Sequence, residues 1–237
     1  MKYIIHKATE RGHANHGWLN AYHSFSFASW YNPEKIQFGM LRVLNDDTIA
    51  AGMGFGTHPH DNMEIITIPL EGDLAHKDSM GNASTIKSGD IQVMSAGTGI
   101  QHSEFNPNHD HHTKLFQIWL FPKYHNVTPR YQQITLDKTE QKNNFAQILS
   151  PHPEDEGVWI HQDAWFYLSD FDKSYASKLA LKKEGNGFYI MNIEGEIEVN
   201  GEKLEKRDAI GIWETNEIEV KATTDSKFLI MEIPMAQ

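Results

Sequence analysis

Histidine is the residue type in this chain whose placement points most directly to chemistry. Twelve of the 14 histidines lie at or before His125, so any imidazole chemistry belongs to the first half of the chain. Two of them, His58 and His60, stand one residue apart in the stretch GTHPHDNMEIITIPLEG (56–72), whose later part is apolar and β-branched like a strand. Alternate side chains of a strand share a face, so this spacing places both imidazoles within reach of one metal ion.

A second pair with the same spacing follows about forty residues later, His102 and Glu104 in GIQHSEF. If both pairs point inward from neighbouring strands, three imidazoles and one carboxylate converge. Three nitrogen ligands and one oxygen ligand suit Fe, Ni, Cu, Mn or Zn and leave positions open for water or substrate. Glu64 stands four residues after His60 and has the same predicted parity, so the spacing leaves Glu64 and Glu104 as alternatives for the carboxylate ligand.

An apolar floor is expected around these ligands, because excluding bulk water tunes the metal and its ligands. The strand residues expected to form it are Phe55, Ile66, Val93 and Phe116. The remaining histidines are given structural roles. His13, His16 and His23 stand among Gly, Trp and Phe and are expected to pack or to hydrogen-bond, and the HDHH run at 109–112 is expected to be a mobile loop.

The elements that must position these residues are predicted to be strands. β-Branched or alternating segments separated by glycine-bearing turns occur at 38–44, 62–70, 90–95, 114–121, 188–193, 196–199, 209–213, 217–220 and 227–233. Short strands at this spacing predict an all-β barrel or sandwich. Helical turns are expected only at 137–144 and 169–176, and the proline-bearing stretch 149–159 is the predicted linker between two halves.

The two halves are predicted to be copies of one β unit. Glu71-Gly72 aligns with Glu194-Gly195, and Gly89-Asp90 aligns with Arg207-Asp208. An ungapped count from these anchors places Leu181 and Lys183 opposite the HPH pair, and Val220 and Ala222 opposite His102 and Glu104. The second copy therefore lacks all four candidate ligands, and its interior is expected to be a packed apolar core that supports the first.

Composition excludes several classes of function. The 237 residues include 21 basic and 32 acidic ones, a net charge of −11, with no basic cluster, which argues against direct binding to nucleic acid or to an anionic membrane. The absence of cysteine excludes disulfides and thiolate ligands. No apolar run is long enough to span a membrane, and the apolar run after Lys2 is too short for a signal peptide, so a soluble cytoplasmic protein is expected.

The motifs resemble those of a known family. The arrangement Gly52-x5-His58-x-His60-x3-Glu64, followed by Gly89…His102-x3-Asn106, is similar to the two cupin motifs. Its departures, seven residues between Glu64 and Gly72 and the form SAGTGIQHSE, match the pirin branch. RGHANHGWLNAYHSFSFASWYNP and GVWIHQDAWFY also resemble bacterial pirin-like proteins, particularly those assigned quercetin 2,3-dioxygenase activity. The resemblance implies a bicupin, with a metal-binding cupin domain at 1–135 and a degenerate cupin domain at 136–237.

The resemblance also implies a site and an activity. The ligands of one divalent transition metal would be His58, His60, His102 and Glu104, with iron favoured over Cu, Ni, Zn, Mn and Co and with Glu64 inward-facing or behind the ligands. The implied activity is the opening of the heterocycle of a flavonol such as quercetin by O2, with a depside and carbon monoxide as products and with Glu104 as the base for the flavonol hydroxyl. A monomer is expected.

Two alternative functions stay open. Animal pirins, which this chain resembles, are described as metal- and redox-responsive transcription cofactors, so the protein is alternatively a regulator that acts through protein partners. The third alternative is a metal-dependent isomerase or a cupin oxygenase with another substrate, since one fold hosts many chemistries.

Overall fold

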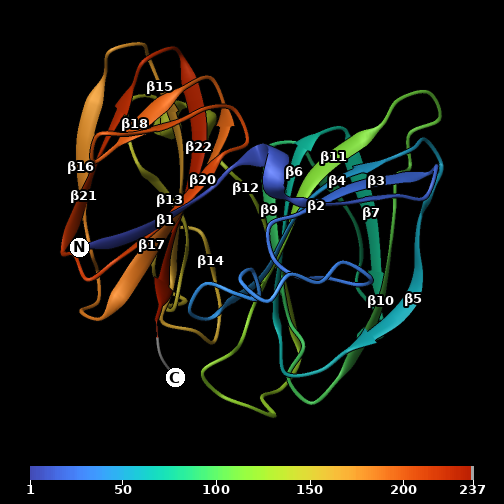
Figure 1. Ribbon diagram of the computed structural model, residues 1–237. Coiled ribbons are helices and arrows are strands. Elements are labelled where there is room, and N and C mark those ends of the chain that lie inside the picture. Colours follow the sequence, from blue (N-terminus) through green and yellow to red (C-terminus); the bar gives the residue numbers. More distant parts are fainter. Residues whose placement is uncertain (236–237) are drawn as a thin grey trace.

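The chain folds into two all-β lobes that lie side by side, as the computed structural model, which describes residues 1–235, shows in Figure 1. Each lobe consists of one seven-stranded and one four-stranded sheet. The described residues form 22 strands and two short 3₁₀ helices, η1 (Ala8–Glu10) and η2 (Lys138–Gln141). Neither helix has the length or the apolar character that crossing a membrane would require.

The first lobe contains the candidate ligands. Its strands are β2 (Gly12–Asn15), β3 (Leu19–His23), β4 (Leu41–Ile49), β5 (Gly54–His60), β6 (Glu64–Glu71), β7 (Asp73–Asp78), β8 (Ala83–Lys87), β9 (Asp90–Ser95), β10 (Ile100–Phe105), β11 (Thr113–Leu120) and β12 (Arg130–Thr135). The large sheet has the order β12-β9-β6-β11-β4-β3-β2, and the small sheet has the order β5-β10-β7-β8. The strands of this lobe pair antiparallel, and an antiparallel sheet commonly packs one of its faces on a core. In this lobe, one face of each sheet lines the barrel interior.

The second lobe repeats this arrangement. Its strands are β1 (Lys2–His6), β13 (Ala146–Ser150), β14 (Val158–Trp159), β15 (Trp165–Phe171), β16 (Ala176–Ala180), β17 (Asn186–Glu194), β18 (Ile197–Val199), β19 (Glu202–Leu204), β20 (Ala209–Trp213), β21 (Glu217–Ala222) and β22 (Ser226–Pro234). The large sheet has the order β1-β20-β17-β22-β15-β13-β14, and the small sheet has the order β16-β21-β18-β19.

The predicted internal repeat is confirmed at its anchors. Gly72 and Gly195 each follow the third strand of a large sheet, β6 or β17, and their φ angles are 74° and 77°. Gly89 and Arg207 also share a left-handed conformation, with φ angles of 101° and 67°. Glycine adopts this conformation without strain, whereas an arginine there is held by its surroundings.

The two lobes exchange an edge strand, which sequence reasoning missed. β1 begins the chain but pairs with β20 of the second lobe, and β12 precedes the second half but pairs with β9 of the first. β1 is followed by η1 and then by the other strands of the first half of the sequence, and β12 is followed by η2 and then by the strands of the second half. Residues 2–6 therefore lie with the second lobe, although the predicted division at residue 135, which stays a prediction, assigns them to the first.

The large sheets pack against each other through one apolar core. Side chains from β11 of the first lobe, such as Phe116 and Ile118, belong to the same buried cluster as Tyr189 and Met191 from β17. Three residues expected to form the floor of the metal site lie in this core between the lobes, on the outer face of their sheet: Ile66, Val93 and Phe116. That part of the predicted floor is wrong.

Two further expectations are corrected. The predicted helical turn at 137–144 is limited to η2, and no helix forms at 169–176, where β15 ends and β16 begins. The ungapped alignment of the two halves is also wrong by several residues at the position of His58. Val220 pairs with Ser177 as His102 pairs with His58, so Ser177 and not Leu181 takes the place of His58. The second lobe's interior is apolar as expected, with Val220 and Ala222 fully buried.

Candidate metal centre

Three histidines converge on the interior of the first lobe. β5 and β10 are antiparallel neighbours, and His102 of β10 stands directly opposite His58, while Ile100 stands opposite His60. One ligand atom from each of His58, His60 and His102 lies within 4.8 Å of the others. The register shifts between His102 and Glu104, where Ser103 of β10 faces two residues of β5, Gly56 and Thr57, and this bulge bends β5 beside its histidine pair.

The distances in this cluster fit a common metal ion. Nε2 of His60 and Nε2 of His102 lie 3.1 Å apart. Two nitrogens bound to one tetrahedral or octahedral ion at about 2.1 Å lie roughly 3.0–3.4 Å from each other. The ring centroids of His58 and His102 are 4.4 Å apart, so the third imidazole closes the same cluster. The donor set is nitrogen-rich and without sulfur, as the sequence predicts.

Hydrogen bonds hold two of the imidazoles with Nε2 free. Nδ1 of His58 donates to the carbonyl oxygen of Gly56 at 2.8 Å. Nδ1 of His102 lies 3.1 Å from Nε2 of His76, which accepts its proton when Nε2 of His102 binds a metal. Such contacts fix the tautomer and the ring orientation of a ligand histidine. His76, on β7 and almost fully buried, was missed by sequence reasoning.

Burial keeps His60 and His102 uncharged. Together with the neighbouring His58, it lowers the pKa of His60 to about 4. It also lowers the pKa of His102 strongly, with contributions from the surrounding imidazoles. A metal ligand must be a neutral imidazole, so these shifts leave the nitrogens ready to bind at neutral pH.

Glu104 lies beside the cluster but outside the group of three ligand atoms. Its side chain is 3% exposed, and the amide nitrogen of Gln117 donates to its two carboxylate oxygens at 3.2 and 3.3 Å. Burial raises the pKa of Glu104 to about 7, while the hydrogen bonds of Gln117 and Thr67 oppose the rise. The carboxyl group is therefore poised to hold or release a proton near neutral pH.

Glu64 is directed away from the histidines. β5 ends at His60 and β6 begins at Glu64 after a turn, so the alternation of one strand does not continue into the next. Within β6, Glu64 shares the face of Ile66, which packs between the lobes. Its Oε2 accepts from Ser95 at 2.6 Å, its Oε1 is buried without a partner, and burial raises its pKa to about 7. The inward parity predicted for Glu64 is not found.

A cavity of about 400 Å³ opens beside the cluster, and His58, His60 and Glu104 contribute to its wall. One side is a series of aromatic contacts: the ring of His60 meets Trp119 at 4.9 Å, and Trp119 meets Phe27 at 5.5 Å. These planes cross nearly at right angles.

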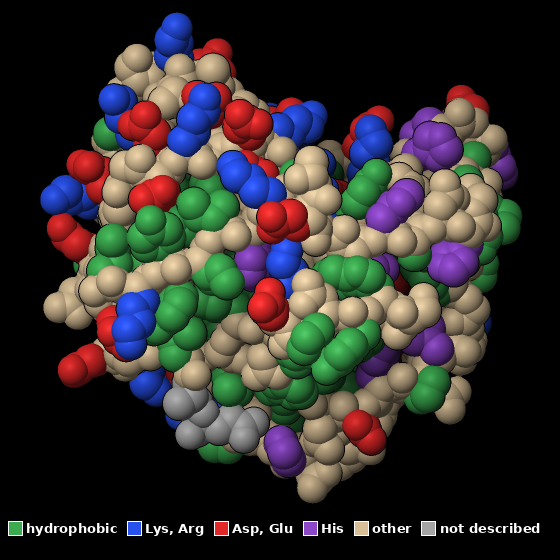
Figure 2. Space-filling view, in the orientation of Figure 1, with side chains coloured by type: hydrophobic (Ala, Val, Ile, Leu, Met, Phe, Trp, Pro, Cys, Tyr) green, Lys and Arg blue, Asp and Glu red, His purple; other side chains and the backbone are tan. Residues whose placement is uncertain are grey.

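The opposite side of this cavity starts from the other histidine of the pair. The ring of His58 lies 6.4 Å from Phe55, and Phe55 lies 5.2 Å from Trp18. Phe55 is the one predicted floor residue that lines the cavity. Histidines also gather on the surface of this lobe, whereas Lys, Arg, Asp and Glu crowd the visible face of the second lobe (Figure 2).

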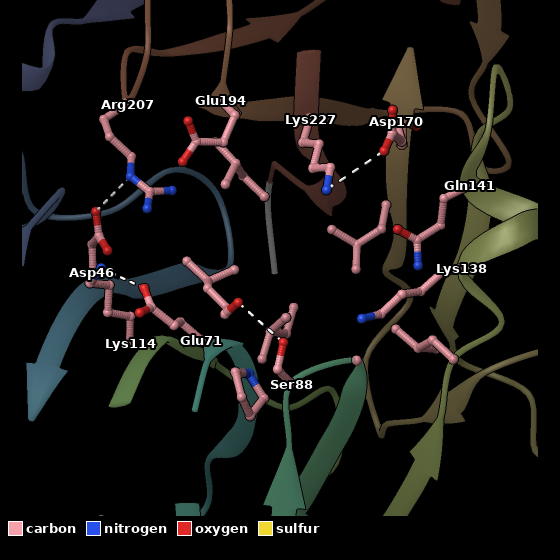
Figure 3. Close-up of a pocket in the computed structure, with 18 of the residues that line it drawn as sticks. Asp46, Glu71, Ser88, Lys114, Lys138, Gln141, Asp170, Glu194, Arg207 and Lys227 are labelled. Carbon is pink, nitrogen blue, oxygen red and sulfur yellow. Dashed lines mark hydrogen bonds and ion pairs between the residues drawn. The ribbon is translucent and has the colours of Figure 1, made fainter. Parts of the chain in front are cut away.

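A larger cavity of about 640 Å³ lies between the lobes and has a different character (Figure 3). Its wall is ionic. Asp46 accepts from Arg207 at 3.2 Å and from Arg11 at 3.1 Å, Glu71 pairs with Lys114, and Asp170 pairs with Lys227. Of these pairs, Asp46–Arg207 joins the two lobes, whereas Glu71–Lys114 lies within the first lobe and Asp170–Lys227 within the second.

Comparisons with known proteins agree with this architecture. Residues 5–120 match the family model described as Pirin, and residues 147–233 match that described as Quercetinase C-terminal cupin domain. The quercetin 2,3-dioxygenase of Escherichia coli K12 is 44% identical over 230 residues, which cover 97% of this chain and 98% of the relative. A pirin-like protein of Caulobacter vibrioides is 38% identical over 222 residues, covering 93% and 95%.

Solved structures give the same result. The crystal structure of YhhW from Escherichia coli superposes with a TM-score of 0.94 at 42% identity and covers 98% of both chains. The nickel(II) complex of the same bacterial pirin superposes with a TM-score of 0.93 at 41% identity and covers 98% of this chain and 99% of the other. With two matching family models, relatives along nearly its whole length and the same two-lobed fold, this chain belongs to the pirin family of bicupins.

Proposed function

We propose that this protein is a metal-dependent dioxygenase that opens the heterocycle of flavonols such as quercetin. The observation that carries the proposal is the aromatic cavity of about 400 Å³ into which His58, His60 and Glu104 project. Ligand pockets of this size are usually apolar with a few convergent polar groups. The name of the Escherichia coli relative, quercetin 2,3-dioxygenase, supports a flat polyphenol as the substrate.

The proposed metal ligands are His58, His60 and His102, with Glu104 as the fourth. The nickel(II) complex of the bacterial pirin supports a divalent transition metal, and we propose iron as the first ion to test. When bound, the metal supplies Lewis-acid polarisation of the substrate oxygens that face it. Affinity order alone does not select among the candidate ions, so the choice requires measurement.

The chain's own residues prepare the substrate for reaction with O2. Once released from the metal, Glu104 accepts the proton of the flavonol 3-hydroxyl, and Gln117 holds its carboxylate in place. Trp119 and Phe27 on one side and Phe55 on the other exclude water and pack against the rings. The overall reaction consumes one flavonol and one O2 and gives one depside and one carbon monoxide.

The test is quercetin turnover by protein loaded separately with Fe, Ni, Cu, Mn, Zn and Co. The loss of quercetin absorbance under air is followed together with carbon monoxide release, because autoxidation of quercetin alone also bleaches the absorbance. We expect at least one metal to give turnover that falls more than about 100-fold in His58→Ala, given that even groups behind a ligand are worth 10–100-fold. If no metal raises carbon monoxide release above that of His58→Ala, the dioxygenase proposal fails and the regulatory alternative is favoured.

A further inference from the structure

A second carboxyl group is buried in the wall of the aromatic cavity, away from the proposed ligands. Asp47 is 5% exposed and lines the cavity. Among residues 1–235, no side chain or backbone group hydrogen-bonds its Oδ1, which is fully buried. Buried polar groups in native proteins are nearly always paired, and an unpaired one calls for an explanation.

The surrounding strands leave Asp47 without a protein partner. It lies in β4, where Ala21 of β3 and Leu115 of β11 stand directly beside it, and both are apolar. Two donors in the same cavity wall are engaged with other acceptors. His23 Nδ1 donates to Asn45 at 2.8 Å, and Gln117 donates to Glu104. The position therefore presents a hydrogen-bonding group to the cavity and not to the protein.

The cavity restricts what this partner is. An anionic group would meet two buried carboxyls, Asp47 and Glu104, in an apolar surrounding where like charges repel strongly. A hydroxyl on a flat ring fits the aromatic walls, and it both donates and accepts, so it pairs with a carboxyl in either protonation state. Burial and the nearby Asp46 and Glu104 raise the pKa of Asp47 to about 8, so at neutral pH it is mainly a protonated donor.

We propose that Asp47 forms a subsite for a phenolic hydroxyl of the substrate, one that lies away from the oxygens facing the histidines. The inference rests on the proposed function, because it takes the cavity's occupant to be a polyphenol. It adds a specificity-determining residue on β4, separate from the candidate ligands on β5 and β10. The neighbouring Asp46 points to the opposite face and into the ionic seam between the lobes (Figure 3), so it provides a matched control.

The experiment measures binding without O2, so that turnover does not enter the result. Quenching of tryptophan fluorescence, to which Trp18 and Trp119 of the cavity contribute, gives dissociation constants for quercetin and for four flavonols that each lack one hydroxyl, at position 5, 7, 3′ or 4′. In the wild type, we expect removal of one of these hydroxyls to weaken binding by about tenfold or more, because a buried group loses its partner.

Two substitutions at Asp47 separate the loss of its hydrogen bond from a change in the shape of the cavity. Leucine is an apolar near-isostere of aspartate. In Asp47→Leu, we expect quercetin and the flavonol that binds weakly to the wild type for lack of one hydroxyl to have dissociation constants within about twofold of each other, whereas Asp47→Asn keeps part of the preference for quercetin. Asp46→Asn keeps the full wild-type preference for quercetin. Thermal unfolding checks that each variant is folded, and Asp47→Asn alone suffices if the leucine variant does not fold.

The outcomes distinguish this inference from the proposed function. If Asp47→Leu shows the wild-type preference, or if no single hydroxyl matters in the wild type, the subsite is rejected even where aerobic turnover is normal. If the preference is found and lost as expected but no metal supports turnover, the subsite stands and the dioxygenase proposal fails. If none of the flavonols binds, the subsite is rejected as well.

Discussion

His76 offers the sharpest test of how the histidine cluster is organised. Its Nε2 lies 3.1 Å from Nδ1 of His102 and is assigned as the acceptor of that proton, and its own Nδ1 is buried without a partner. His76→Phe keeps the ring, which packs 5.1 Å from Tyr131, but removes the acceptor. The substitution therefore isolates one hydrogen bond behind a candidate ligand.

The size of the effect follows from the groups left unpaired. Without metal, the variant loses one orphaned group, Nδ1 of His76, and gains another, the N–H of His102. We therefore expect the free energy of unfolding of the metal-free protein to change by less than about 1 kcal/mol. Metal binding fixes the His102 proton on Nδ1 and needs the acceptor. Loss of such a contact weakens metal affinity by roughly 10–100-fold, which is about 1.4–2.7 kcal/mol.

The assay is a chelator-competition titration of the metal together with denaturant unfolding of the metal-free and loaded forms. At saturating metal, the stabilisation by the metal falls by the same 1.4–2.7 kcal/mol in His76→Phe, since linkage depends on the dissociation constant. His76→Gln keeps an acceptor oxygen and should remain within a few-fold of the wild type. His13→Phe is the matched control, because His13 stacks on Tyr22 at 4.6 Å, outside the cluster.

The opposite result would refute the reasoning. If His76→Phe bound the metal with wild-type affinity, His102 would need no acceptor for its proton. The assignment of the His102 proton to Nδ1 would then be wrong. A large loss in metal-free stability would mean instead that His76 is a packing residue.

Two further predictions concern stability. Burial raises the pKa of Glu64 to about 7 in the folded protein, so its contribution to the free energy of unfolding is complete below about pH 4.5 and is lost as the pH rises to about 7. Denaturant unfolding between pH 5 and 8 should therefore show the free energy of unfolding of Glu64→Gln rising by up to about 3 kcal/mol relative to that of the wild type. A difference between the two proteins that does not change with pH would contradict the burial argument. Arg207→Ala and Arg207→Gly both lose the ion pair with Asp46, but glycine also relieves the strain of the left-handed backbone at φ 67°. Denaturant unfolding should therefore show the glycine variant to be more stable than the alanine variant by about 1 kcal/mol. Equal stabilities would mean that the backbone at residue 207 is unstrained.

Local patterns account for what could be predicted from the sequence. The period of two in a strand places His58 and His60 on one face, and the glycine turns set the repeat, so the all-β fold and the HPH pair follow from residues close in sequence. Gly72 and Gly195 work as anchors because their turns need a left-handed residue at the same place in each lobe.

What was missed depends on strand order, which the pattern does not contain. His76 reaches His102 because β7 pairs with the far side of β10, an arrangement set by the closure of the barrel. A signal existed, since His76 and Asp78 share a strand face with the apolar Leu74, but nothing local said which strand lies beside that face. The parity predicted for Glu64 failed for a related reason, because a turn at 61–63 interrupts the alternation.

The distribution of buried groups explains why the chain carries a lobe without ligands. The interior of the first lobe holds polar side chains that chemistry needs, including His102, Glu104 and Asp47, and each displaces apolar surface that would otherwise stabilise the barrel. The outer face of its large sheet compensates by packing on the second lobe, whose own interior is apolar throughout the cluster around Val220. The exchange of β1 and β12 ties the two folds together, so the burial gained in one lobe stabilises the polar interior of the other.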